Sequence, residues 1–178
     1  MRDAVLVVDV FDDFQHEDGD ALLASFQERM AALVEAIAVA RAKGMPVVYV
    51  NDQRGRWDGD ARGLVRAATE QTPDLTPLAP RPGDPFVLEP RYSAFDHTPL
   101  VLLLRELEVE RILLVGASTE GCIVQSGIDA RELGFKVTIL ADACATTDSE
   151  LEEIALRYAA EVAGMRVSAA RSLRAGAY

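Results

Sequence analysis

The stretch that decides the fold is Ala4-Val5-Leu6-Val7-Val8, followed directly by Asp9. An unbroken apolar run rich in valine is typical of a strand buried on both faces of a parallel sheet. Similar short apolar runs recur at positions 47–50, 86–88, 112–115 and 137–140. The sequence therefore predicts several buried parallel strands, and the residues that follow each run are expected at the carboxyl edge of the sheet, where such folds bind ligands.

Segments with helical periodicity separate these apolar runs. Apolar residues recur at steps of three and four from position 23 to 37, and a glycine and a proline then end that helix. Further helices are predicted to open at Thr98, to run from Thr119 to Gly134, and to begin near Thr147. The last of them carries a predicted buried face of Leu151, Ile154, Ala155, Tyr158 and Val162. This alternation predicts a three-layer α/β/α, Rossmann-like fold with a doubly wound, mainly parallel sheet of six strands.

Length and composition indicate one globular domain over residues 1–178. Hydrophobic residues make up 49% of the chain and charged residues 26%, which excludes disorder as the main state. The net charge of −11 repels phosphates and anionic lipids, so neither nucleic acid nor a membrane surface is an expected partner. The apolar start is too short for a signal peptide, and two cysteines without a CxxC pair fit a reducing cytoplasm best.

Two phosphate-binding motifs and an imidazole metal site can be tested against the sequence. Residues 116–121 have the glycine spacing of a phosphate loop, but Cys122 and Ile123 follow where Lys and Ser or Thr are required. The first strand leads into acidic residues instead of a glycine turn, which disfavours a nucleotide-binding domain. The only histidines, His16 and His97, lack ligand spacing, so we expect no metal ion. An oxygen-only divalent site after the first strand stays open as an alternative.

Cys122 is the strongest candidate for a catalytic residue. It follows the fourth apolar run and lies in the first turn of the next helix, where the helix dipole lowers a thiol pKa and free N–H groups can hold an oxyanion. Asp9 and Glu89 end two other strands, so all three side chains should meet at one edge of the sheet. The alternative for Cys122 is a buried small hydrophobe, and that structural role is the one expected for Cys144.

Three separated motifs resemble a known family. They are VVDVFDDF at 7–14, VLEPRYSAF at 87–95 and GASTEGCI at 116–123, followed by Asp-Ala pairs at 129–130 and 142–143. Together they resemble the isochorismatase-like cysteine hydrolases, which include nicotinamidases, carbamoyl-amide hydrolases and isochorismatases. The resemblance covers nearly the whole chain and implies the same doubly wound fold. It also implies a homo-oligomer, either a dimer or a tetramer.

The resemblance assigns roles to residues of this chain. It implies that Asp9 is the catalytic acid and base, that Cys122 is the nucleophile, and that no cofactor is needed. The backbone N–H groups of Ser118 and Cys122 would hold the oxyanion, with a cis peptide between Ala117 and Ser118. The position that the family fills with its catalytic lysine holds Glu89 in this chain.

An acid at position 89 changes the electrostatics of the thiol. A unit charge about 4 Å away is worth roughly 4 kcal/mol at an effective dielectric near 20, so Glu89 should raise the thiol pKa. Catalysis stays possible if Asp9 and Glu89 share one proton, or if Arg91 supplies the missing cation. If neither holds, the chain is a catalytically silent relative that serves as a small-molecule-binding or assembly protein.

The substrate side of the site is less sharply specified. Residues 49–58 resemble family members that lack the nicotinamidase metal site, which argues against nicotinamide as substrate. The leading hypothesis is a cysteine-dependent hydrolase that acts on a small amide, carbamoyl or related carbonyl compound through a thioester on Cys122. The expected pocket residues are Phe11, Arg54, Trp57, Arg91, Tyr92 and Phe95.

Overall fold

The computed structural model describes residues 2–178. The strands are β1 (Asp3–Val8), β2 (Val47–Asp52), β3 (Phe86–Glu89), β4 (Arg111–Gly116), β5 (Lys136–Cys144) and β6 (Arg166–Ser168). The helices are α1 (Gly19–Ala42), α2 (Ala61–Gln71), α3 (Leu100–Glu106), α4 (Val124–Glu132), α5 (Ser149–Glu161) and α6 (Ser172–Ala175). A 3-10 turn, η1, spans Pro73–Leu78, and a π-helical turn, η2, spans Thr119–Ile123.

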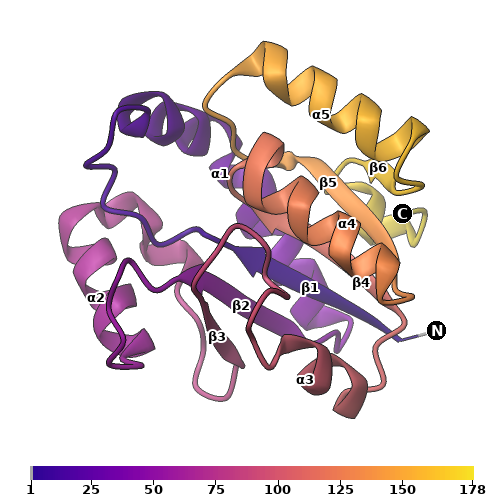
Figure 1. Ribbon diagram of the computed structural model, residues 1–178, viewed down its shortest axis with the longest axis horizontal. Coiled ribbons are helices and arrows are strands. Elements are labelled where there is room, and N and C mark those ends of the chain that lie inside the picture. Colours follow the sequence, from indigo (N-terminus) through magenta and orange to yellow (C-terminus); the bar gives the residue numbers. More distant parts are fainter. Residues whose placement is uncertain (1) are drawn as a thin grey trace.

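The six strands form one sheet in the order β3-β2-β1-β4-β5-β6, and every neighbouring pair is parallel. The chain winds outward from β1 to β3, returns to β4 on the other side of β1, and continues to β6 (Figure 1). Strand order therefore reverses between β1 and β4, where Val8 pairs with Gly116. In open α/β sheets this reversal opens a crevice at the carboxyl ends of the strands.

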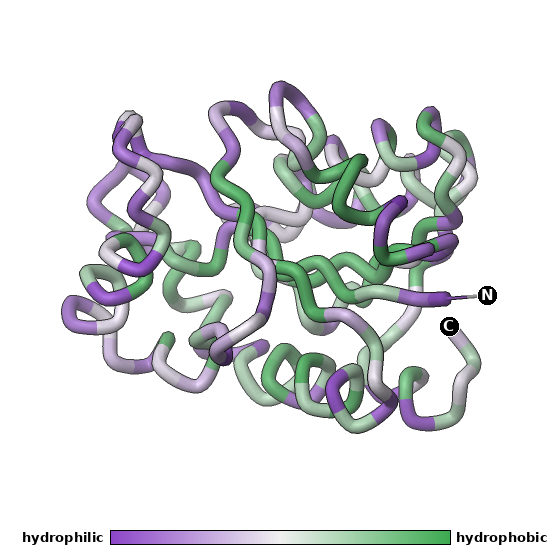
Figure 2. Tube along the Cα trace, turned by 90° about the horizontal axis from the view of Figure 1, so that it is seen from below, coloured by the Kyte–Doolittle hydropathy of each residue, from purple (hydrophilic) through white to green (hydrophobic). Residues whose placement is uncertain are grey.

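Alternate residues of each strand enter two separate hydrophobic cores. Val5 and Val7 pack under α1, α2 and α6, whereas Leu6 and Val8 pack under α3, α4 and α5. Figure 2 shows the hydrophobic strands running through the middle of the molecule between the two helical layers. Burial on both faces explains why the strands read as continuous apolar runs, and it confirms the predicted three-layer fold.

The five apolar runs of the sequence all form strands. The sixth strand, β6, has three residues and a single fully apolar side chain, Val167, so periodicity could not locate it. Helices α2 and α6 and the turn η1 were likewise not predicted. None of the helices formed by residues 2–178 combines the length and the apolar character that a bilayer-spanning helix needs.

Helix α5 corrects one sequence prediction. Most of its predicted buried face is exposed, with 51% of Leu151, 54% of Ile154 and 67% of Val162 accessible to solvent, whereas Ala155 packs against the core. The residues buried in α5 are Glu152 and Ala159. The helix has apolar side chains on two faces, so spacing alone does not select one of them. An ion pair between Glu152 and Arg29 of α1 draws the other face inward.

Candidate active site

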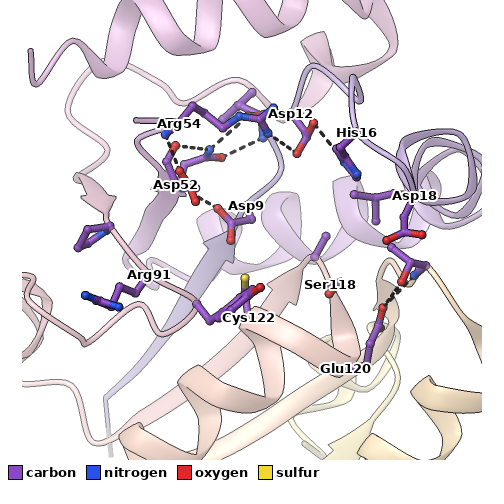
Figure 3. A pocket seen from close by; sticks show the side chains of 17 residues that line it. Asp9, Asp12, His16, Asp18, Asp52, Arg54, Arg91, Ser118, Glu120 and Cys122 are labelled. Carbon is purple, nitrogen blue, oxygen red and sulfur yellow. Dashed lines mark hydrogen bonds and ion pairs between the residues drawn. The ribbon is translucent and has the colours of Figure 1, made fainter. Parts of the chain in front are cut away.

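A cavity of about 640 Å³ opens at the carboxyl edge of the sheet, beside the switch point between β1 and β4 (Figure 3). Its walls come from the loop after β1, the end of β2, the loop after β3 and the turn η2. These segments are far apart in sequence, and the parallel sheet places their starting points at one edge. The cavity thus lies where the strand-end residues were expected to converge.

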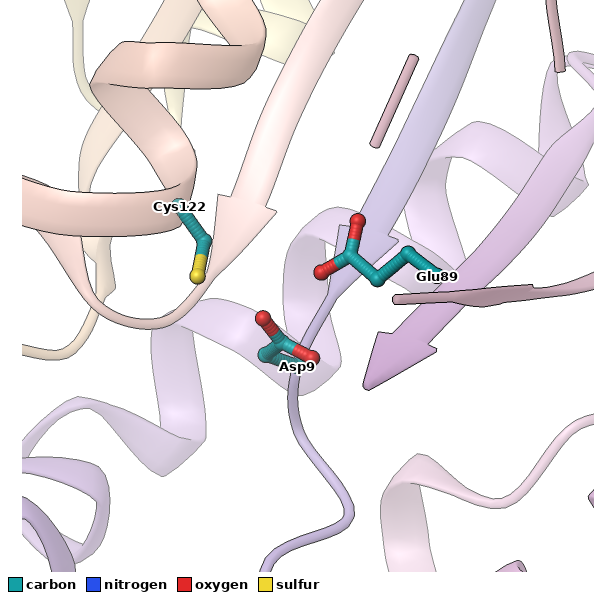
Figure 4. A group of neighbouring side chains, drawn as sticks. All are labelled: Asp9, Glu89 and Cys122. Carbon is teal, nitrogen blue, oxygen red and sulfur yellow. The ribbon is translucent and has the colours of Figure 1, made fainter. Parts of the chain in front are cut away.

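Asp9, Glu89 and Cys122 meet beside this cavity, as the sequence predicts. One ligand atom from each, two carboxyl oxygens and the sulfur, lie within 4.8 Å of one another (Figure 4). Asp9 directly follows β1 with a φ of 49°, Glu89 is the last residue of β3, and Cys122 lies in η2. A left-handed φ is more accessible to aspartate than to most residues, and here it turns the chain out of the sheet.

A backbone hydrogen bond from β2 fixes the position of the Asp9 carboxyl. Its Oδ1 accepts a hydrogen bond of 2.6 Å from the N–H of Asp52, the last residue of β2. Burial raises the pKa of Asp9, although hydrogen bonds to its charged form oppose that rise. The raised pKa makes Asp9 a group that can take up and release a proton.

Glu89 is the least solvated of the three groups. Its side chain is fully buried at 0% exposure, and neither carboxyl oxygen has a hydrogen-bond partner among residues 2–178. Burial, and after it the negative charge of Asp9, raises the pKa of Glu89 far above its ordinary range. Both effects favour the protonated, neutral form of Glu89.

The Cys122 thiol has a raised pKa. Burial is the main cause, and the negative charge of Asp9 adds to it. The Ser118 backbone N–H, which faces the sulfur, works in the opposite direction. The lowering expected from the start of the helix is therefore outweighed, chiefly by burial and after it by the acidic neighbours.

Arg91 does not supply the missing cation. It lines the cavity, but its side chain is 69% exposed and its Nε lies 3.6 Å from a carboxyl oxygen of Asp96. Of the two ways in which catalysis could stay possible with Glu89, the one that relies on Arg91 is therefore wrong. The chain bends after Pro90, and the guanidinium remains in solvent beside another carboxylate.

Polar contacts hold the turn that carries Cys122. The peptide between Ala117 and Ser118 is cis, as the resemblance implies. The Thr119 N–H donates to the Ala145 carbonyl at 2.8 Å. Glu120 accepts hydrogen bonds from the Thr147 N–H and from the hydroxyls of Thr147 and Thr146. Partial burial raises the pKa of Glu120, but these bonds outweigh it and the pKa is lowered. The segment after β5 therefore supports this turn.

Comparison with known proteins matches the whole of this architecture. A family model described as the isochorismatase domain covers residues 3–171. The chain belongs to the isochorismatase family. It is 31% identical over 155 residues to the uncharacterized isochorismatase family protein YaaI of Bacillus subtilis, with 86% of each chain covered.

Other known proteins are similar to this chain over most of their length. Ureidoacrylate amidohydrolase RutB of Stutzerimonas stutzeri is 28% identical over 190 residues, covering 87% of this chain and 74% of that protein. A probable inactive nicotinamidase of Arabidopsis thaliana is 26% identical over 162 residues, covering 83% of each chain. The crystal structure of a cysteine hydrolase from Pseudomonas syringae pv. phaseolicola has a TM-score of 0.79 at 26% identity, covering 99% of this chain and 94% of that one.

The second cysteine of this isochorismatase-family protein is placed as a core residue. Cys144 is fully buried at the end of β5, and its sulfur lies 3.6 Å from the Leu114 carbonyl that accepts its weak hydrogen bond. Burial raises the pKa of the Cys144 thiol. The contrast with Cys122, which lines the cavity, agrees with the structural role expected for Cys144.

The predicted pocket residues are only partly brought together. Phe11, Arg54, Arg91 and Tyr92 line the cavity, whereas Trp57 and Phe95 do not. Trp57 is 81% exposed in a surface loop. Phe95 packs against Phe135 with ring centroids 6.2 Å apart. Their aromatic character indicated burial against something apolar, and for Phe95 that partner is the protein core.

Arg54 is not free to bind an acidic substrate group. Its guanidinium pairs with Asp12 and Asp13, the two carboxylates after β1. Sequence reasoning placed Arg54 among the pocket residues, and it does line the cavity. Its single positive charge offsets part of the charge of the two carboxylates at the rim of the cavity (Figure 3).

Sequence reasoning also missed several polar residues of the cavity wall, among them Asn51 and His16. The Asn51 side chain accepts a hydrogen bond from the Phe11 N–H and donates to the Phe11 carbonyl, which holds the loop after β1. His16 lies 3.7 Å from a carboxyl oxygen of Asp12. An asparagine inside an apolar strand was a signal for Asn51, since buried amides need polar partners. For His16 the spacing rules for metal ligands gave no such signal.

Proposed function

We propose that this isochorismatase-family protein is a cysteine-dependent hydrolase that acts on a small amide, carbamoyl or related carbonyl compound. The observation that carries the proposal is the meeting of the Asp9 carboxyl and the Cys122 sulfur beside a cavity of about 640 Å³. A nucleophile, a base and backbone N–H groups around one point are what acyl transfer needs. Amidohydrolase relatives such as RutB support an amide or a carbamoyl group as the target.

The first half of the reaction forms a thioester. As the Cys122 sulfur attacks the carbonyl carbon, its proton passes to Asp9 and a carbon–sulfur bond forms. The carbonyl oxygen becomes negative and accepts hydrogen bonds from the N–H groups of Ser118 and Cys122. Asp9 then gives its proton to the leaving nitrogen, the carbon–nitrogen bond breaks, and an amine or ammonia departs.

The second half of the reaction releases the acyl group with water. Asp9 accepts a proton from the water as its oxygen attacks the thioester carbon. The carbon–sulfur bond breaks, the proton returns to the sulfur, and a carboxylic or carbamic acid leaves. The overall balance is one amide and one water converted into one acid and one amine, so no cofactor is consumed.

Glu89 serves in this scheme as the neutral partner of Asp9. Two buried carboxyls side by side cannot both ionise cheaply, so one of them stays protonated. With that proton on Glu89, Asp9 is free to act as the base. This arrangement keeps Asp9 charged without a neighbouring cation. The Cys122 thiol then ionises only when its proton moves to Asp9 during the attack.

The experiment is a screen of small amides and carbamoyl compounds, with amine or ammonia release as the readout and a chelator present throughout. Cys122→Ser should lose at least about a thousandfold in rate, because the weaker oxygen nucleophile lacks an activating base of matching strength. Cys144→Ser is the matched control and should keep the parent rate. A quenched reaction should show the acyl group on Cys122 by mass spectrometry. Turnover that survives Cys122→Ser would exclude the mechanism.

A second candidate function is a catalytically silent family member that binds a small molecule or assists assembly. The observation that favours it is the pair of acidic groups beside a thiol whose pKa is raised. A relative named as probably inactive supports it. Glu89→Lys separates the two candidates. If that variant hydrolyses amides that the parent does not, the parent is silent; if it weakens an existing activity, Glu89 takes part in turnover.

A further inference from the structure

We propose that Asp9, Glu89 and Cys122 form a binding site for one thiophilic divalent cation, Zn²⁺, with a thiolate and two carboxylates as ligands. The proposal concerns binding and does not depend on turnover. Sequence reasoning had no route to it, because metal-ligand spacing rules compare neighbouring positions and these ligands come from three separate strand ends.

The geometry of the three groups supports a common ligand. The two carboxyl oxygens and the sulfur lie within 4.8 Å of one another, and Figure 4 shows the three side chains pointing toward one region. Zinc binds oxygen at about 2.0–2.2 Å and thiolate sulfur at about 2.3 Å, so tetrahedral ligands lie roughly 3.5 Å apart. To reach this separation around one ion, the two ligand atoms that lie farthest apart must approach each other by about 1 Å. Glu89, whose carboxyl has no hydrogen bond to break, can rotate to supply it.

The strongest independent observation is the unsatisfied Glu89 carboxyl. It is fully buried, it points into the group, and both of its oxygens lack a hydrogen bond among residues 2–178. Buried polar atoms without partners are uncommon in folded proteins, and a bound ion is one of the standard reasons for them. A cation between the three groups would satisfy Glu89 and neutralise the surrounding negative charge.

The charges around the group also favour a cation. The charges that chiefly act on this group are those of Asp9 and Asp52, and Glu89 adds a further negative charge once it releases its proton to the solvent. The two arginines that line the cavity are directed at other carboxylates, Arg54 at Asp12 and Asp13, and Arg91 at Asp96. The field at this point is therefore negative.

The donor set selects among cations. A thiolate ligand favours zinc over magnesium and calcium, which prefer six or more oxygen ligands. Three protein ligands leave a fourth position, and Asp9 and Cys122 both face the cavity, so an ion and a water molecule can enter. Coordination displaces the thiol proton and the carboxyl proton into solvent. It also occupies the sulfur lone pair that attacks a carbonyl, so bound zinc and thioester formation exclude each other.

The experiment titrates the full-length chain, stripped with a chelator and then freed of it, with Zn²⁺ by calorimetry and with Co²⁺ by absorption spectroscopy. We expect one ion per chain and a sulfur-to-cobalt charge-transfer band in the near ultraviolet. Glu89→Gln and Cys122→Ser should each weaken binding at least about tenfold, and Cys122→Ser should abolish the band. Cys144→Ser is the matched control and should leave both readouts unchanged.

A second readout guards against variants that fail to fold. In the unmodified chain, Zn²⁺ should slow alkylation of Cys122 at least about tenfold, since a metal-bound thiolate is a poor nucleophile. No charge-transfer band with Co²⁺, or binding that both substitutions leave unchanged, would overturn the proposal. Amide hydrolysis is assayed separately in chelator, so a chain that binds zinc but hydrolyses nothing contradicts the proposed function alone.

Discussion

The position of one proton governs the chemistry among Asp9, Glu89 and Cys122. Burial disfavours charge on all three, and each negative charge makes the next ionisation harder. The group therefore titrates as a unit, with its protons held more tightly than isolated carboxyls and thiols hold theirs. Two consequences of this coupling can be measured without knowing the substrate.

Alkylation of Cys122 by iodoacetamide should be slow at pH 7 and should accelerate with pH without levelling off below pH 9. The reason is that only thiolate reacts, and the pKa of Cys122 is raised by burial and by Asp9. The measurement is labelling rate against pH, in chelator, with the modified residue located by mass spectrometry. Cys144, which is fully buried, should stay unlabelled in the folded chain. A rate that is already constant at pH 6 to 8 would contradict a raised thiol pKa.

Glu89→Gln should stabilise the chain increasingly as the pH rises from 5 to 8. Burial raises the pKa of Glu89 above its ordinary 4.5, so the folded chain keeps a proton that the unfolded chain releases above that pH. The free energy of unfolding is therefore highest below pH 4.5, where both states hold the Glu89 proton. It falls as the pH rises from 4.5 toward the pKa of Glu89 in the folded chain. Glutamine removes this loss, which is at most about 1.4 kcal/mol per pH unit.

The measurement is the difference in Tm between Glu89→Gln and the parent chain in chelator. A chain of this size shifts by about 2–4 °C per kcal/mol, so a difference of several degrees should develop between pH 5 and pH 8. Parallel Tm curves for the two proteins would show that Glu89 does not carry the extra proton.

At the scale of elements, the site depends on how closely β1 and β4 approach at their carboxyl ends. Gly116 ends β4 opposite Val8, and its φ of 122° lies in a region open to glycine. The chain then enters η2, which presents Cys122 toward Asp9. The distance between Asp9 and Cys122 therefore depends on a close backbone contact between β1 and β4, which a side chain at position 116 would disturb.

Gly116→Ala should destabilise the chain by more than about 3 kcal/mol. A Cβ there would lie 1.9 Å from the Val8 carbonyl oxygen, so backbone must move in addition to the strain of a positive φ. The matched control is Gly134→Ala, which has a φ of 92° and open space around its Cβ position, and should lose only about 1 kcal/mol. Urea unfolding measures both, and equal losses would mean that the β1–β4 approach is not restrictive.

A second element-scale contact ties α1 and α5 to the loop that holds Cys122. Arg29 donates to both carboxyl oxygens of Glu152, and the Thr119 hydroxyl donates to one of them at 2.9 Å. Glu152→Ala should cost about 2–4 kcal/mol, because it leaves a half-buried guanidinium without its partner. Replacing both charges, with Arg29→Met and Glu152→Leu together, should cost less. The free energy of unfolding of both variants is measured in urea. A double variant that is less stable than Glu152→Ala would contradict this account.

At the scale of the whole molecule, the family resemblance predicts a homo-oligomer. Light scattering on the purified chain should give a dimer or a tetramer, that is, two or four times 19.3 kDa. The measurement should be repeated at high salt, because a net charge of −11 on each chain opposes self-association at low ionic strength. A monomer mass under both conditions would contradict the prediction.

The sequence by itself determined the fold class and the location of the site. The five apolar runs and the helices between them are local patterns, and a buried parallel strand can form only from such a run. The placement of Asp9, Glu89 and Cys122 at one sheet edge follows from connectivity, since parallel strands all end at the same side. These conclusions needed no distances.

Only the tertiary structure decided the protonation of the site, the direction of Arg91 and the buried face of α5. Each depends on contacts between residues far apart in the chain. Burial and the charge of Asp9 raise the pKa of Glu89. Asp96 lies beside Arg91 and pairs with its guanidinium. The pairing of Arg29 with Glu152 chooses which side of α5 faces inward. Desolvation and Coulomb energies vary steeply with distance and with depth below the surface, and neither quantity is encoded in the order of residues.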